Sequence, residues 1–158
     1  SAITLSSGDT ASTCTGAPAA SLTTFGSSRT PKRSANRSRI TASARRCTCS
    51  ICRMRGAVAV TSTPAGFRIT QGDDKLATYR FNTGVAEHHF CSVCGIYTHH
   101  KRRSNPNELG VNVACLEGVS PFDFREVKVH DGTRHPADNS DHRTYPAGVL
   151  RFEPAPGD

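Results

Sequence analysis

Two short cysteine motifs constrain this chain of 158 residues more than any other feature. The first is the run CTCSIC from Cys47 to Cys52, and the second is CSVCG from Cys91 to Gly95. The spacing C-x-C-x-x-C can place three thiolates around one ion, and a zinc ion with three protein ligands keeps a fourth position for water or substrate. The C-x-x-C-G turn is typical of structural zinc knuckles, which usually need a second pair of ligands. The spacing therefore predicts a zinc protein.

A disulfide framework is the alternative for a short cysteine-containing chain. Residues 1–25 lack the basic start and apolar run of a secretory signal, so we expect the thiols to stay reduced. No stretch approaches the roughly 18 apolar residues of a membrane span. We therefore expect a cytoplasmic protein with no membrane contact. Aromatic residues make up only 6% of the chain, so bound metal would contribute to its folding.

Positive charge is concentrated at the N-terminus. Residues 1–46 carry seven Lys or Arg against one Asp, whereas the remainder carries 13 basic and 12 acidic residues. The N-terminal segment is rich in Ser, Thr and Ala and shows neither a helical nor a strand period, so its composition predicts disorder. Three interpretations of this segment stay open: it could bind nucleic acid through phosphates, act as a transit peptide, or be a solvated tail without a role.

Short strands are predicted after Cys47, and no segment has a helical period over ten residues. Turn residues at 64–66 and 82–84 separate apolar or alternating runs, and the second cysteine motif lies at the tip of a hairpin. The candidate strands are 56–62, 75–81, 85–90, 95–100, 111–118 and 122–129. We expect a β-rich zinc domain over 44–136 and a polar, proline-rich tail over 137–158.

Four histidines flank the second motif on the two hairpin strands: His88, His89, His99 and His100. Alternation places one of each pair on each face of the sheet. The knuckle could recruit them as ligands, but nearby thiolates bind zinc in preference. We expect most of them to be surface or hydrogen-bonded residues, and Cys115 to be a small buried residue within a strand.

The stretch ARRCTCSICRMRGA, followed by HHFCSVCGIYTHHKRRSNPNELGVNVACLEGV, resembles the family of glutathione-dependent formaldehyde-activating enzymes, whose domain is also named after centromere protein V. The resemblance covers about residues 44–136. It implies a small zinc-binding, mostly antiparallel β fold of the Mss4-like type. It also implies Cys47, Cys49 and Cys52 as catalytic zinc ligands, and Cys91 and Cys94 as half of a structural zinc site.

The chain departs from the family ahead of Ala44. Family members carry a C-x-C on an early strand about twenty residues before the catalytic cysteines, whereas residues 24–43 contain no cysteine and Cys14 stands alone further upstream. We therefore interpret residues 1–43 as a low-complexity basic segment that is disordered or was translated out of frame. If the segment is genuine, the five clustered cysteines could instead close a single site.

The family resemblance implies chemistry on a thiol and formaldehyde. Three thiolates on one Zn²⁺ give a site of net charge −1, which suits a soft fourth ligand such as the thiol of glutathione or of another substrate. The expected enzyme is a carbon-sulfur lyase that resembles S-(hydroxymethyl)glutathione synthase. Arg53 and Arg55 lie beside the last ligand and could bind substrate carboxylates, although a solvated basic turn is an equal interpretation.

Two other functions stay open. The first is a non-catalytic zinc module that binds nucleic acid or chromatin. It would need a basic face on the folded part, and the near-balanced charge after residue 46 argues against it. The second is a purely structural zinc protein. The sequence does not indicate an oligomeric state.

Overall fold

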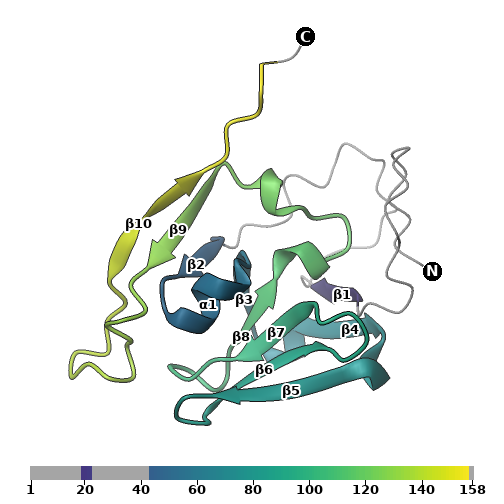
Figure 1. The fold of residues 1–158 in the computed structure, drawn as a ribbon, viewed down its shortest axis with the longest axis horizontal. Coiled ribbons are helices and arrows are strands. Elements are labelled where there is room, and N and C mark those ends of the chain that lie inside the picture. The colour runs from purple at the N-terminus through teal and green to yellow at the C-terminus, as the bar shows by residue number, and fades with distance from the viewer. Residues whose placement is uncertain (1–18, 23–42, 157–158) are drawn as a thin grey trace.

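The computed structural model describes residues 19–22 and 43–156. These residues form an eight-stranded sheet and a two-stranded sheet, with one short α-helix (Figure 1). This confirms the predicted mostly β fold. The strands are β1 Ala19–Leu22, β2 Arg45–Cys47, β3 Ala59–Ser62, β4 Phe67–Gln71, β5 Leu76–Phe81, β6 Ala86–Cys91, β7 Tyr97–Lys101, β8 Leu109–Asn112, β9 Glu126–His130 and β10 Pro146–Arg151; the helix is α1 Ser50–Arg55. Apart from β1 and Ser43, the predicted basic segment 1–43 lies outside the described residues.

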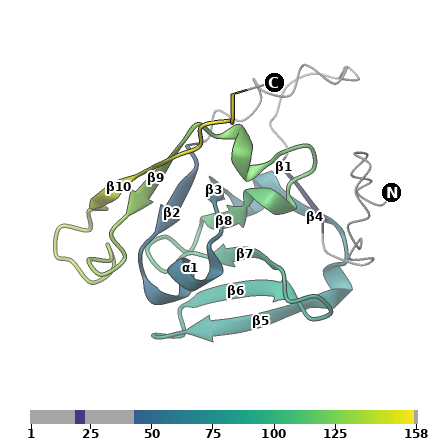
Figure 2. The ribbon, with the colours of Figure 1, turned by 45° about the horizontal axis from the view of Figure 1, so that its top comes forward.

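The large sheet brings distant parts of the chain together. Its strand order is β10-β9-β2-β3-β8-β7-β6-β5, and every neighbouring pair is antiparallel except β2 and β9. The smaller sheet pairs β1 with β4. Figures 1 and 2 both show α1 between the β2–β9 side of the large sheet and the strands β6 and β7. The position of helix α1 therefore places the first cysteine motif between β2 and β9 on one side and β6 and β7 on the other.

The β6–β7 hairpin forms as the sequence predicts. His88 pairs with His100 and His89 with His99, so each face of the hairpin carries one cross-strand histidine pair. Gly95 closes the turn with a φ of 75°, a left-handed conformation that glycine adopts without steric cost.

The predicted strand over 111–118 is wrong after its first two residues. Strand β8 ends at Asn112, and Val113–Cys115 forms a 3-10 turn. The side chain of Asn112 explains the change, because its Oδ1 accepts a hydrogen bond from the Ala114 N–H at 3.2 Å and its Nδ2 donates to the Tyr97 carbonyl at 2.8 Å. Cys115 is buried as expected, but in the turn.

The segment predicted as a polar tail contains an ordered strand. Within residues 137–158, β10 pairs antiparallel with β9. All of its residues are exposed, so no burial pattern marks the strand in the sequence. Backbone hydrogen bonds to β9 hold it, and these depend on register rather than on side-chain type.

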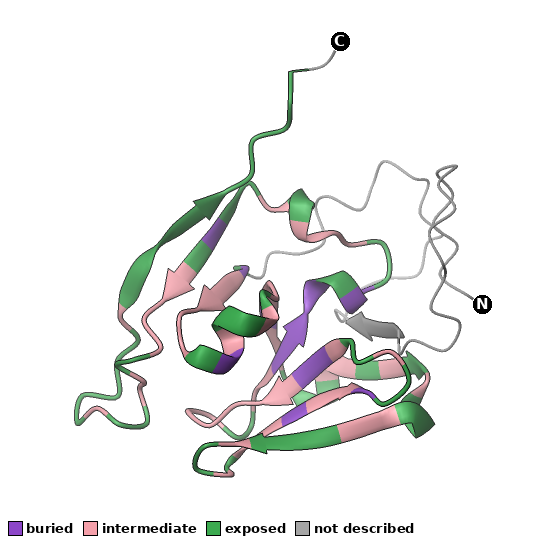
Figure 3. Cartoon of the chain, in the orientation of Figure 1, coloured by how far each residue is buried: buried purple, intermediate pink, exposed green. Residues whose placement is uncertain are grey.

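The hydrophobic core is small and aliphatic (Figure 3). It lies at the centre of the large sheet, where Val60 of β3 and Val111 of β8 are fully buried neighbours. Its other members are Ala44, Val113, Leu116 and Val127. Each buried valine or leucine contributes about 1.5–3 kcal/mol, which makes a modest core that fixes β2 and β9 beneath the first cysteine motif. In the part of the chain that the structure describes, no helix is long and apolar enough to cross a membrane.

Candidate metal centre

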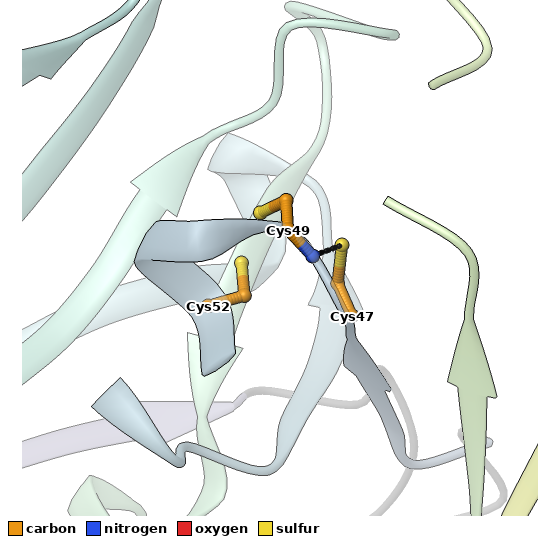
Figure 4. A group of neighbouring side chains, drawn as sticks. All are labelled: Cys47, Cys49 and Cys52. Carbon is orange, nitrogen blue, oxygen red and sulfur yellow. Dashed lines mark hydrogen bonds between the residues drawn. The ribbon is translucent and has the colours of Figure 1, made fainter. Parts of the chain in front are cut away.

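The three cysteines of the first motif converge on one point (Figure 4). Cys47 ends β2, Cys49 is the N-cap of α1, and Cys52 lies within the helix. Their three Sγ atoms all lie within 4.8 Å of one another. Zinc–sulfur bonds of about 2.3 Å in a tetrahedron place sulfurs about 3.8 Å apart. The three thiols therefore fit a zinc ion with small adjustments.

The local backbone explains why the sulfurs meet. The Arg53 N–H donates to the Cys49 carbonyl at 2.8 Å, which opens the helix, and Gly56 ends it in a left-handed conformation with its N–H bonded to the Cys52 carbonyl at 3.1 Å. The Cys49 N–H also donates to the Cys47 Sγ at 3.4 Å. A strand end, a tight turn and one helical turn thus aim the three side chains at a shared space.

Residues after β9 pack directly on the cysteines. The Thr48 N–H donates to the His130 carbonyl at 3.0 Å, and the Gly132 N–H donates to the Thr48 Oγ1 at 2.9 Å. A Cβ on Gly132 would lie 2.3 Å from the Cys49 nitrogen and 2.5 Å from the Cys47 Sγ. Only glycine leaves room for the cysteines at this position.

The three thiols are coupled to one another through hydrogen bonds. Hydrogen bonds with Cys47 and Cys52 lower the pKa of Cys49. The hydrogen bond with Cys49, together with burial, raises the pKa of Cys47, and hydrogen bonds with Cys47 and Cys49, together with burial, raise that of Cys52. Negative charge therefore gathers on Cys49. Such a preference for thiolate is what a cation site requires, because the thiolate is the form that binds metal.

The cysteines open on a cavity of about 440 Å³. Its other walls come from β6, β7, β9 and the loops that follow β7 and β9. Five arginines line it: Arg45, Arg46, Arg55, Arg102 and Arg103. Arg102 is paired with Glu108 and Arg103 with Asp138. The unbalanced positive charge favours an anionic ligand beside the thiols.

One wall of the cavity is built from the hairpin. His88 and His100 stack with ring centroids 5.1 Å apart. Arg55 donates from Nη1 to the His88 Nδ1 at 2.8 Å, and its guanidinium lies 4.7 Å from the centre of the Tyr97 ring. The Tyr97 hydroxyl contacts the His100 Nδ1 and reaches the Gly110 carbonyl at 3.3 Å. Burial lowers the pKa of His88 to about 4 and that of His100 to about 3, so both rings are neutral at pH 7.

The structure separates the two arginines that the sequence analysis grouped together. Arg55 lines the cavity, whereas Arg53 is exposed and is not part of its wall. The two differ because they are two positions apart on a helix, where each residue turns by about 100°, so their side chains point to nearly opposite sides.

The second cysteine motif lies away from this cavity. Cys91 is fully buried, and its N–H donates to the Ile96 carbonyl at 2.9 Å across the hairpin turn. Among the described residues, no group of three potential metal ligands includes Cys91 or Cys94, so the five cysteines do not gather into one site there. Cys14 lies outside the described residues. His89 and His99 stack at 4.4 Å on the opposite face of the hairpin from His88 and His100.

Several residues of the cavity were missed by sequence reasoning. Arg45 had a usable signal, because it precedes Cys47 by two positions on a strand and alternation places both side chains on one face. Tyr97, His130 and Gly132 had none, since only tertiary packing brings them to the cysteines.

The chain is similar to known proteins. Residues 34–129 match the model of a family described as glutathione-dependent formaldehyde-activating enzyme, a match that begins ahead of Ala44. A crystal structure of a Rhodobacter sphaeroides protein is similar to this chain, with 45% sequence identity and a TM-score of 0.59. That similarity covers 73% of this chain and 94% of the other. The family match spans more than half of the sequence, and the chain belongs to the glutathione-dependent formaldehyde-activating enzyme family.

Proposed function

We propose that this protein is a zinc-dependent enzyme that adds a thiol, glutathione or a related compound, to formaldehyde and catalyses the reverse reaction. This is the reaction of S-(hydroxymethyl)glutathione synthase, a carbon-sulfur lyase. One observation carries the proposal: three thiols within 4.8 Å of one another line a cavity that is rich in arginine. A structural zinc site is closed by four protein ligands and needs no cavity beside the ion.

The reaction needs no oxidant or reductant. The thiol sulfur forms a bond to the carbonyl carbon of formaldehyde, the C=O π electrons move to oxygen, and the thiol proton ends on that oxygen. Zinc held by Cys47, Cys49 and Cys52 would supply a Lewis acid that favours the deprotonated substrate thiol at neutral pH. The protein itself has to hold the thiol compound and limit water around the reacting atoms.

Arg55 is prepared for the binding task. His88 accepts its hydrogen bond and Tyr97 lies under its guanidinium, so the side chain loses little further freedom when it binds a carboxylate. Because an arginine can only donate, the His88 Nδ1 is the acceptor and its ring proton lies on Nε2. Arg53 is exposed, and its contribution would be limited to attraction of an anionic substrate.

Cys91 and Cys94 are proposed as two ligands of a separate structural zinc ion. Their remaining ligands would come from residues that the structure does not describe. The left-handed Gly95 and the hydrogen bond from its N–H to the Cys91 carbonyl at 2.8 Å support a knuckle-type turn at this place.

The test is a direct assay of adduct formation. Exchange of ¹³C-formaldehyde into S-hydroxymethylglutathione is followed by NMR, with zinc content measured on the same samples. We expect the wild type to exceed the uncatalysed rate and Cys49→Ser to fall to it. Cys115→Ala, a buried cysteine outside the trio, is the matched control and keeps the activity. A wild-type rate equal to that of buffer refutes the proposal.

A further inference from the structure

Arg45 is a half-buried cation that lacks a full set of partners. Its Nη2 atom is inaccessible to solvent and has no hydrogen-bond partner among the described residues. An unsatisfied buried donor on a charged group destabilises a fold more than almost any other polar defect. A cavity ligand could supply the missing partner only if the guanidinium turns toward the cavity, whose wall the Arg45 side chain helps to form.

Local charges do not compensate Arg45. Glu108 is the acidic group that acts on it, and Glu108 is already paired with Arg102. One carboxylate thus serves two guanidinium groups, which leaves an excess positive charge. The same two arginines also help to lower the pKa of His100 and of His130, so their field reaches across the cavity.

The position of Arg45 points to a ligand. It lies two residues before Cys47 on β2, and both side chains line the cavity of about 440 Å³. A molecule held by its sulfur at the three cysteines would extend along the wall that carries Arg45. Arg55 also lines the cavity, but one of its donors is already bound to His88, whereas Arg45 Nη2 has no partner among the described residues.

We propose that Arg45 binds a carboxylate of the thiol substrate and makes the enzyme select thiols that carry a carboxylate over neutral thiols. The inference rests on the proposed function, because it names a specificity residue of the same site. A carboxylate offers two acceptor oxygens that match two guanidinium N–H groups, and it would neutralise the excess charge. Arginine suits this task better than lysine, because its donors are held in a fixed fork.

Kinetics with matched thiols test the assignment. Glutathione is compared with its diethyl ester, in which both carboxylates are blocked, in the wild type and in Arg45→Met. Loss of a charge-assisted pair raises the KM for glutathione about 10- to 100-fold in Arg45→Met, with kcat nearly unchanged. The KM for the diethyl ester is high in both proteins. Arg68→Met, an exposed arginine on β4 outside the cavity, is the matched control.

Thermal unfolding separates a binding role from a structural one. Replacement of an incompletely paired, half-buried cation by an apolar side chain removes its desolvation cost, so Arg45→Met should unfold at the same or a higher temperature. A lower unfolding temperature with unchanged KM would assign Arg45 to the fold and overturn the proposal. If Arg45→Met does not fold, the wild type alone decides. Equal KM values for glutathione and its diethyl ester overturn the proposal, and a KM at least ten-fold higher for the ester supports it.

A binding measurement keeps this inference distinct from the proposed function. S-methylglutathione retains both carboxylates but has a blocked sulfur, so calorimetry reads its binding without turnover. Binding to the wild type that is lost in Arg45→Met supports the assignment, even if no thiol is turned over. Absence of turnover would refute only the proposed function. Absence of binding to the wild type, or binding that Arg45→Met leaves unchanged, overturns it.

Discussion

The two cysteine motifs look alike in sequence but have different surroundings. The sulfurs of Cys47, Cys49 and Cys52 face a cavity with arginines and neutral histidines in its wall. Cys91 and Cys94 lie at the tip of a hairpin, where Cys91 is fully buried and the intervening Val93 is 64% exposed to solvent. The turn is closed by its own backbone hydrogen bonds.

The contrast shows what cysteine spacing can and cannot establish. Spacing sets how many thiolates can reach one ion, but access to the open position decides whether that ion can meet a substrate. The first motif has such access because β9 and the hairpin leave a space beside it. The second motif has none among the described residues.

Loss of a ligand from the first motif should have the largest effect. We expect Cys52→Ser to lower turnover at least about 1,000-fold, because loss of a metal ligand's hydrogen-bond partner alone typically costs 10- to 100-fold. Adduct formation at saturating zinc measures the effect. A variant that retains turnover within ten-fold would remove the distinction between the two motifs.

The second motif should affect stability instead. Structural zinc contributes about 10–16 kcal/mol in small domains, so Cys94→Ser should reduce the free energy of unfolding by roughly 3 kcal/mol if one of four ligands is lost. Zinc per chain should fall as well. Urea unfolding and elemental analysis report the two quantities, and unchanged values of both would show that Cys94 binds no metal.

Crowding at the first motif should have a smaller effect. Gly132→Ala places a Cβ against the Cys49 nitrogen and the Cys47 Sγ, which we expect to cost about 2 kcal/mol and to lower zinc affinity. Gly66→Ala is the control, because its nearest contacts are the side-chain oxygens of Ser62 and Thr63 at 3.2 and 3.3 Å. Equal behaviour of the two variants in zinc titrations would contradict the close packing of Gly132.

A pH effect on the hairpin should be the smallest near neutral pH. Burial, with His89 nearby, lowers the pKa of His99 to about 4. The unfolded chain then binds a proton near pH 6.5 that the folded chain refuses, so stability is full above pH 6.5 and falls towards pH 4, by at most about 1.4 kcal/mol per pH unit. His99→Gln should lose its share of this dependence, whereas His88 and His100, whose pKa values are also lowered, keep theirs. Urea midpoints from pH 7.5 to 5 measure it, and parallel curves for the two proteins would refute it.

Local patterns predicted much of this molecule. The hairpin and its alternating histidines follow from a strand period of two, and the cysteine trio follows from spacing within six residues. The 3-10 turn after Asn112 was missed because a side-chain hydrogen bond overrides the alternation of Val111 and Val113. Strand β10 was missed because nothing on it is buried.

The cavity wall could not be predicted, because its parts meet only through sheet order. His130 and Gly132 reach the cysteines through the parallel pairing of β9 with β2, and no pattern within either segment encodes that pairing. Arg45 is the exception. Its place on the strand was readable, but its missing partner appears only once Glu108 is seen bound to Arg102.

The parallel pairing of β2 with β9 also sets an order of events on the ribosome. Thr48 and Gly132, which hydrogen-bond to each other, are 84 positions apart. At ordinary elongation rates, roughly 4 to 17 s separate their synthesis. During that interval the three thiols are already translated while the segment that covers them does not yet exist. A metal ion that bound at this stage would therefore reach the thiols from the side that Gly132 later occupies.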